Sequence, residues 1–133
     1  MATFGDAEAA AIAILTADAA IIAKDVTVST TLVGLDEQPR WLQVHRAGGV
    51  PTAWMGLDNA QVAIAAYGET QSEALDLINA ARAAILAARG IYTGWGLALY
   101  DVSDQLGVAY DPDPLTPSLA RYTLTLTLVT RPA

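Results

Sequence analysis

His45 is the only histidine in the chain and the first residue to consider for catalysis. It lies in a predicted strand, Arg40 to Arg46, where a period of two places it on one face with Trp41 and Gln43. General acid–base or nucleophilic catalysis needs a partner, such as a serine, a cysteine or a second histidine at a recognisable spacing. The sequence offers none. We therefore expect no catalytic residue and interpret His45 as a surface or interface histidine.

Four carboxylates, at Asp101, Asp104, Asp111 and Asp113, precede the last strand of the sequence. Calcium requires several oxygen ligands at tight spacing with a turn glycine, and Asp-x-x-Asp followed by Asp-Pro-Asp-Pro does not match an EF-hand loop. The chain has no cysteine, which excludes disulfides and thiolate metal sites. We expect no metal and no cofactor, and interpret these residues as a solvated acidic loop.

The segment from Ala47 to Asp58 is long for a connection between two strands, and long ordered loops are usually functional. Gly48-Gly49 after Arg46 is no phosphate cradle, because no Lys-Ser/Thr and no helix N-terminus follow it. These glycines instead predict positive φ or a close backbone approach. Tryptophan and methionine beside an arginine are typical of protein–protein contacts. The predicted interface residues are Arg46, Gly48, Gly49, Val50, Trp54, Met55 and Leu57.

Size and charge limit the possible functions. The 133 residues predict one domain, spanning residues 1–133, with a sizeable core. The formal charge of −7 argues against direct nucleic-acid binding, which relies on Lys and Arg to neutralise phosphates. The N-terminus lacks the basic region of a signal peptide, and Thr16, Asp18, Lys24 and Asp25 interrupt the first apolar run. We expect a soluble protein made in the cytoplasm.

The periodicity predicts a single α+β domain, an antiparallel or mixed sheet of four to five strands packed against two helices in the order α-β-β-β-α-β-β. The predicted helices cover residues 6–23 and 70–89, and the predicted strands cover residues 26–32, 40–46, 60–67, 97–102 and 121–130. Both faces of the 60–67 strand are largely apolar, so we expect it to be central and covered on both sides. A stiff connector with three prolines, Asp111 to Pro117, precedes the last strand.

Both predicted helices carry start signals. Asp6 is a predicted N-cap, followed by a stripe of Ile12, Leu15, Ala19 and Ile22 that Ile14 and Ile21 broaden. Thr70-Gln-Ser-Glu73 fits a capping box, and Gly90 is a predicted stop. The expected apolar stripe of the second helix is Leu75, Ile78, Ala81 and Ile85. Trp41 and Trp95 are either core residues or contact residues.

The combined pattern resembles the tail terminator (tail completion) proteins of long-tailed, siphovirus-type phages of actinobacteria, and the resemblance covers nearly the whole chain. The matching elements follow the alanine-rich first helix in order: Arg46-x-Gly48-Gly49, Asp58-Asn59 and Tyr67, Ala74 with Leu77 and Arg82, and a proline-rich connector. The last strand then opens with Arg121-Tyr122 and closes with Val129-Thr130-Arg131. The order and spacing of these motifs carry the resemblance.

The resemblance implies a structural virion protein without enzymatic chemistry. It implies a ring, expected to be a hexamer, that caps the head-proximal end of the tail tube, stops tube polymerisation and offers a docking surface to the head connector. The implied partners are further copies of the chain, the major tail tube protein and the connector or stopper protein, with DNA passing through the lumen. The implied location is the virion tail, after assembly in the host cytoplasm. Another head–tail joining protein, or a small cellular enzyme or ligand-binding domain, remains an alternative.

A ring gives the last strand a second role. Tyr122, Leu124, Leu126 and Leu128 alternate with Thr123, Thr125 and Thr127, and no Lys or Glu guards residues 122–130. We expect the threonine face, and any free backbone edge, to lie at the seam between subunits, with Tyr122, Thr123, Thr125 and Thr127 as seam residues. Asp111 and Asp113 form a predicted acidic rim. Six copies would carry six times the formal charge of −7, which would let DNA slide if that charge lines the channel.

Overall fold

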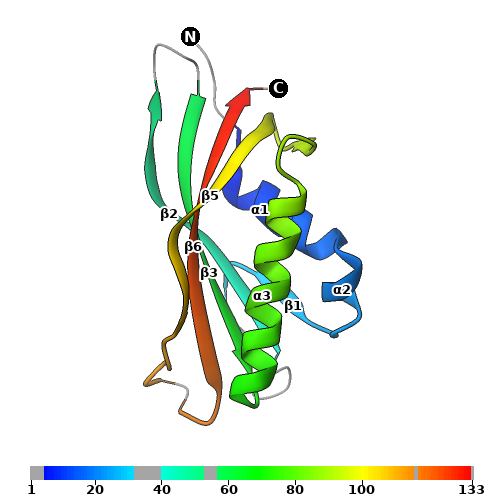
Figure 1. Cartoon of the computed structure of the whole chain (residues 1–133), viewed down its shortest axis with the longest axis vertical. Coiled ribbons are helices and arrows are strands. Elements are labelled where there is room, and N and C mark those ends of the chain that lie inside the picture. Colours follow the sequence, from blue (N-terminus) through cyan, green and yellow to red (C-terminus); the bar gives the residue numbers. More distant parts are fainter. Residues whose placement is uncertain (1–4, 32–39, 53–56, 116, 133) are drawn as a thin grey trace.

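A single mixed sheet, curled into a half-barrel, carries helices on one of its faces (Figure 1). The computed structural model describes residues 5–31, 40–52, 57–115 and 117–132. Within them the strand order is β1-β2-β3-β6-β5-β4, with β1 and β2 parallel and every other neighbouring pair antiparallel. The strands are β1 (Thr27–Ser29), β2 (Trp41–Thr52), β3 (Leu57–Gly68), β4 (Thr93–Gly94), β5 (Leu97–Tyr110) and β6 (Ala120–Pro132). The helices are α1 (Ala7–Ala17), α2 (Ala19–Ile22) and α3 (Gln71–Ala87).

The predicted α+β class and the mixed sheet are confirmed. The strand count was wrong, because the described residues form six strands rather than four to five. The additional strand is β4, whose two residues pair only with Leu97 and Ala98 at the start of β5. Two residues leave no measurable periodicity in a sequence, so pattern alone does not find such a strand.

The segment between the second and third predicted strands is a long hairpin rather than a loop. β2 continues to Thr52 and β3 begins at Leu57, with Thr52 opposite Leu57 and Gly48 opposite Gln61. The predicted strand ends at residues 46 and 60 were therefore wrong. Glycine and proline in this stretch suggested a loop, but both residues are accepted in strands at bulges and at sheet edges.

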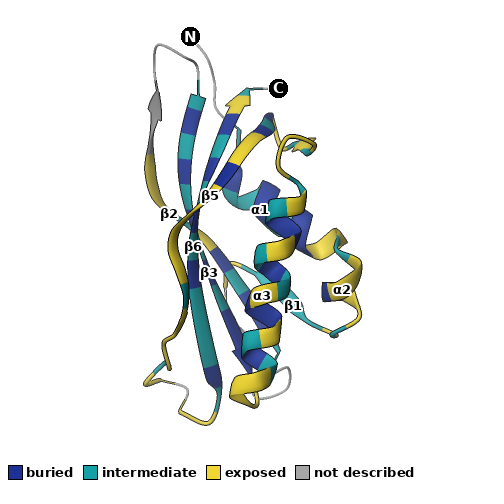
Figure 2. Ribbon diagram, viewed as in Figure 1, coloured by how far each residue is buried: buried dark blue, intermediate teal, exposed yellow. Residues whose placement is uncertain are grey.

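The core lies between the sheet and α3. Leu124, Leu126 and Leu128 of β6 are buried in one cluster with Ile78 and Ile85 of α3 (Figure 2). β6 pairs with β3 on one side and with β5 on the other. The expectation of a free backbone edge on this strand was therefore wrong, because the chain returns to fill the middle of the sheet.

β3 is central, as predicted, but only its helix-covered face is buried along most of its length, whereas the opposite face is buried at Tyr67 near the end of the strand. Val62 and Ile64 are buried beneath the helices, whereas Ala63 and Ala65 on the opposite face are only half-buried. The expectation of cover on both sides was wrong for the single subunit. Small alanine side chains made both faces look apolar, although only one meets its own helices.

Asp18 divides the first predicted helix in two. Asp6 caps α1 by accepting a hydrogen bond from Ala9 N at 2.9 Å, as predicted, and Asp18 caps α2 by accepting one from Ile21 N at 3.2 Å. The break changes which side chains are buried, so Ile14 and Ile21 enter the core and Ile22 is 62% exposed. The predicted stripe through Ile22 was wrong because it assumed one continuous helix.

α3 is the helix that the sequence predicted. The hydroxyl of Thr70 accepts a hydrogen bond from Glu73 N at 3.1 Å, which confirms the Thr70 half of the predicted capping box, whereas Oε1 of Glu73 lies 3.6 Å from Arg40 Nε. Ile78, Ala81 and Ile85 are buried as expected, while Leu75 is half-buried. With 17 residues the helix is about 26 Å long. It spans much of the sheet and covers one of its faces (Figure 1).

Candidate assembly surfaces

A buried ion pair fixes the base of the β2–β3 hairpin. Nη1 and Nη2 of Arg46 donate to the two carboxylate oxygens of Asp58 at 2.8 and 2.9 Å, and Nε donates to the carbonyl of Gly48 at 3.0 Å. Asp58 is only 2% exposed. The hydrogen bonds that Arg46 donates to Asp58 raise the pKa of Arg46. Arg46, predicted as a contact residue, thus directs its guanidinium into its own hairpin.

A bulge beside this ion pair explains the two glycines. Ala47 is the extra residue between the pairs Arg46–Val62 and Gly48–Gln61. Gly48 and Gly49 have φ values of +139° and +100°, and a Cβ on Gly49 would lie 1.8 Å from the carbonyl oxygen of Asn59. The prediction that these glycines provide positive φ and close approach is confirmed.

The remaining predicted hairpin contacts lie toward its tip. Val50 is opposite Asn59 in the strand ladder, and Leu57 is opposite Thr52 and half-buried. Trp54 and Met55 lie outside the described residues, so their interface role stays a prediction.

The opposite end of the sheet is held by Tyr67 and Arg121. The hydroxyl of Tyr67 donates to Asp113 Oδ2 at 3.3 Å and accepts from Arg121 Nη1 at 3.5 Å. Arg121 also lies 3.2 Å from Asp111 and 4.0 Å from Asp113, and burial raises the pKa of Tyr67. Both predicted rim carboxylates therefore face an arginine, which ties the 111–115 connector to the sheet.

Asp101 and Asp104 are strand residues, and the expectation of a solvated loop was wrong for them. They lie on β5, where Asp104 makes a two-point contact with Arg82 at 2.6 and 3.0 Å, and Asp101 lies 3.9 Å from Arg89. The hydrogen bonds from Arg82 lower the pKa of Asp104. Among the described residues, no group of three or more His, Cys, Asp or Glu side chains is arranged to hold a metal ion.

The predicted seam residues divide between the two faces of β6. Thr123, Thr125 and Thr127 are half-buried on the open face, opposite Ala65, Ala63 and Gln61 of β3. Tyr122 lies on the helix-covered face, where its ring centroid is 5.2 Å from that of Tyr110. Tyr122 therefore lies on the face opposite the threonines, although the next residue in the sequence, Thr123, is one of them.

The remaining aromatic candidates differ in exposure. Trp41 is 5% exposed, so it is a core residue, and its indole nitrogen has no hydrogen-bond partner within the described chain. Trp95 is 60% exposed and has φ +51°, in the turn that connects β4 to β5. His45 is exposed on the open face of the sheet, opposite Ala63.

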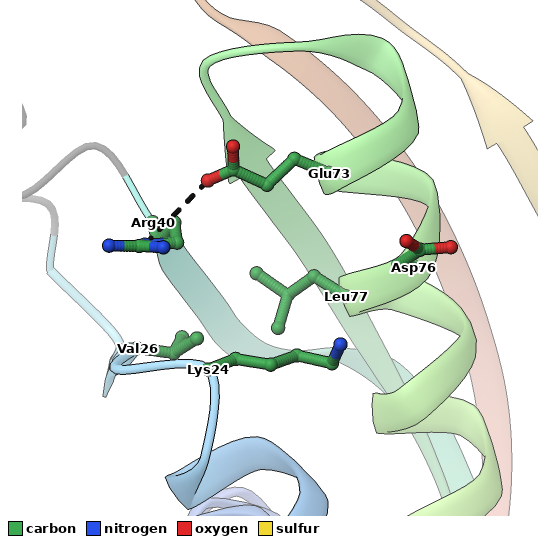
Figure 3. Close-up of a pocket in the computed structure, with 6 residues that line it drawn as sticks. All are labelled: Lys24, Val26, Arg40, Glu73, Asp76 and Leu77. Carbon is green, nitrogen blue, oxygen red and sulfur yellow. Dashed lines mark ion pairs between the residues drawn. The ribbon is translucent and has the colours of Figure 1, made fainter.

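A small cavity of about 210 Å³ lies beside the first turn of α3 (Figure 3). It is lined by Lys24, Val26, Arg40, Glu73, Asp76 and Leu77. Arg40 Nε lies 3.6 Å from Glu73 Oε1, and neither atom makes a hydrogen bond. Leu77 and Val26 give the cavity an apolar side, and the two cations and two carboxylates balance in charge. Its described lining contains no serine, cysteine or histidine.

Two of these features were not predicted. The partnership of Arg46 with Asp58 has a signal in the sequence, because the two residues flank a hairpin and lie 12 positions apart. The cavity has no such signal in the sequence, because Lys24, Arg40 and Asp76 come from three separate segments of the chain. No described helix is long and apolar enough to cross a membrane.

Comparison with known proteins gives a clear likeness among solved structures. No protein-family model matches the chain, and no curated protein sequence matches it. Among solved structures, the chain is similar to a chain of the structure described as "Virion of native gene transfer agent (GTA) particle". The TM-score is 0.68, the sequence identity is 16%, and the match covers 93% of each chain. At this identity the likeness shows a shared fold, with strands and helices in the same arrangement along nearly their whole lengths.

Proposed function

We propose that this protein is a structural component of a phage-type virion, a tail terminator whose ring, expected to be a hexamer, caps the head-proximal end of the tail tube. The observation that carries the proposal is the fold shared with a chain of a gene transfer agent virion over 93% of both chains. The ordered motifs of the sequence support the more specific assignment. In this proposal the protein has no enzymatic activity, and it functions in the virion after assembly in the host cytoplasm.

The shape of the subunit supports two separate docking ends. The β2–β3 hairpin and the β5–β6 connector lie at opposite ends of the longest axis (Figure 1). Each end is stiffened by an arginine, Arg46 at the hairpin and Arg121 at the connector. A terminator ring needs this arrangement, because one rim would bind the last ring of tube protein and the other would bind the head connector.

The hairpin is proposed as the tube-binding end. The test replaces Ala53-Trp54-Met55-Gly56 by Asn-Gly, a two-residue turn that suits a tight hairpin between Thr52 and Leu57. The replacement leaves the Arg46–Asp58 pair in place. We expect a folded protein that no longer caps purified tail tubes, as counted by electron microscopy.

Trp95→Ala is the matched control, because it removes another tryptophan that is 60% exposed and lies outside the hairpin. This variant should cap tubes normally. Normal capping by the shortened hairpin would refute the hairpin assignment. Failure of the unaltered chain to bind tube ends would refute the terminator function itself.

A different head–tail joining protein is the second candidate, because the virion similarity fits any ring-forming joint. Such a protein would bind the connector or the portal side rather than the tube end. The same microscopy separates the two candidates, since a stopper would leave tube ends free while a terminator would cover them.

A further inference from the structure

The outer edge of β2 is guarded against pairing with another strand. β1 covers Trp41 to Gln43, and beyond it the carboxylate of Glu8 accepts the backbone N–H of Arg46 at 3.3 Å. The other oxygen of Glu8 accepts from the hydroxyl of Thr30 at 2.6 Å, which anchors the carboxylate. Further along, Pro51 has no N–H to donate. These are devices by which proteins prevent edge-to-edge association.

The outer edge of β5 is guarded as well. Leu99 exchanges backbone hydrogen bonds with Gly90 and Tyr92, at 3.0 and 2.9 Å. The backbone N–H of Val102 donates to the carboxylate of Asp101 at 2.9 Å. Three register irregularities between Leu99 and Ala109 then disrupt the strand geometry. Because both edges are guarded, association between copies should use the faces of the subunit.

The open face of the sheet is one such surface. Ala63, Ala65, Thr123, Thr125 and Thr127 form its uncharged centre. Four strands at about 4.8 Å spacing, each about 40 Å long, give an area on the order of 800 Å². That is about what each partner contributes to a stable protein interface.

Part of the helix layer, around α2 and the C-terminal end of α3, is a second surface with few charges. An exposed helix surface normally carries charged or polar residues. Here the exposed residues include Ile22, which is 62% exposed, and Ile91, which is 78% exposed. An apolar groove of about 320 Å³ separates α1 from the end of α3. The other exposed apolar residues nearby are Ala17, Ala19, Ala20, Ala23, Ala83 and Ala87.

We infer that the helix layer of one copy packs on the open sheet face of the next copy. The two surfaces lie on opposite sides of the subunit (Figure 1), so the contact is head-to-tail and can close into a ring. Each sheet would then be covered by helices on both faces, its own and those of its neighbour. Packing of one sheet face on another would give a closed dimer and leave the helix layer exposed. The inference rests on the proposed ring function and specifies its subunit contact.

The experiment uses two single variants, Thr125→Lys on the sheet face and Ile91→Glu on the helix layer. Each alone places an unpaired charge in the contact, which should weaken association at least about 100-fold. Analytical ultracentrifugation should show each variant as a monomer with unchanged melting temperature. An equal mixture should form rings again, because alternating subunits place the lysine against the glutamate in one contact and leave the next contact unaltered.

Leu115→Glu is the control, because Leu115 is 89% exposed and lies on the connector outside both surfaces. This variant should form rings. Normal rings from either single variant, a mixture that stays monomeric, or an unaltered chain that is monomeric at millimolar concentration would each overturn the inference. Binding to tube ends could still succeed in those cases, which keeps the proposed function separate. If either variant unfolds, Thr127→Lys and Ala87→Glu repeat the test at another position on each surface.

Discussion

Asp58 lies almost fully buried between two strands, and Arg46 is the cation that neutralises it with two hydrogen bonds. Asp104 makes the same two-point contact with Arg82, but on the surface. A buried pair that loses one member leaves an uncompensated charge or donor, whereas an exposed pair is replaced by water at little cost. Both arginines therefore make two hydrogen bonds to one carboxylate, but the two pairs should contribute differently to the stability of the fold.

Removing each carboxylate should reveal this difference. We expect Asp58→Ala to lower the free energy of unfolding by about 2 kcal/mol, because Arg46 is only a third exposed and loses two charge-assisted hydrogen bonds. Asp104→Ala, the matched control, should lower it much less. Urea unfolding followed by circular dichroism measures both. Equal losses for the two variants would show that burial does not distinguish them.

At the scale of elements, the bulge in the β2–β3 hairpin depends on one glycine. A Cβ at position 49 would lie 1.8 Å from the Asn59 carbonyl oxygen, with φ already at +100°. We expect Gly49→Ala to destabilise the protein by about 1–3 kcal/mol, because both the backbone conformation and the space exclude a side chain. Gly107→Ala is the control, since nothing lies within 4 Å of its Cβ position and its φ is not in the positive region.

Thermal unfolding of both variants gives the comparison. A melting temperature for Gly49→Ala as high as for Gly107→Ala would mean that the hairpin relaxes around the added methyl group. In that case the bulge would not be a fixed part of the fold.

The sequence predicted the elements whose periodicity is long and unbroken, and it failed where local geometry interrupts the pattern. α3 and β6 were predicted almost to their ends, because a capping threonine and seven alternating residues are strong signals. Asp18 broke the first helix through a single side-chain hydrogen bond to Ile21, which no stripe of apolar residues reveals. The hairpin strands ran on through glycine and proline because a bulge and an edge position accept them.

The candidate surfaces were predictable only as far as residue type allows. The threonines of β6 were correctly placed on one face, but Tyr122 belongs to the opposite face by the same alternation. The predicted contact role of Arg46 overlooked Asp58, whose partnership depends on the register of the hairpin. Contacts that depend on register and on the space around a side chain require the three-dimensional structure.

At the scale of the whole molecule, the arginines are largely used within the subunit. Six ion pairs engage five of them in the described structure: Arg40–Glu73, Arg46–Asp58, Arg82–Asp104, Arg89–Asp101, Arg121–Asp111 and Arg121–Asp113. The formal charge of −7 is therefore accompanied by few free cations. We expect this charge distribution to repel the phosphate backbone of DNA, as the channel of the proposed ring would require.

This repulsion can be measured directly. We expect no binding of the unaltered chain to duplex DNA in a gel-shift assay at low salt, because it offers no cluster of free Lys or Arg. Replacing Glu69 and Asp76 by lysine adds two units of charge at each position and brings the formal charge from −7 to −3. Both residues are exposed, and Asp76 lines the cavity that contains Lys24 and Arg40, so the double variant gains a basic patch there.

The double variant should bind DNA measurably, and its affinity should fall as salt rises, since each phosphate contact releases counterions. Micromolar or tighter binding by the unaltered chain would contradict the view that its charge keeps DNA from adhering. A double variant that still does not bind would show that net charge outweighs a local patch in this protein. The assay thus separates the effect of the net charge of the molecule from the effect of its local charge arrangement, which is the distinction that matters for the channel of the proposed ring.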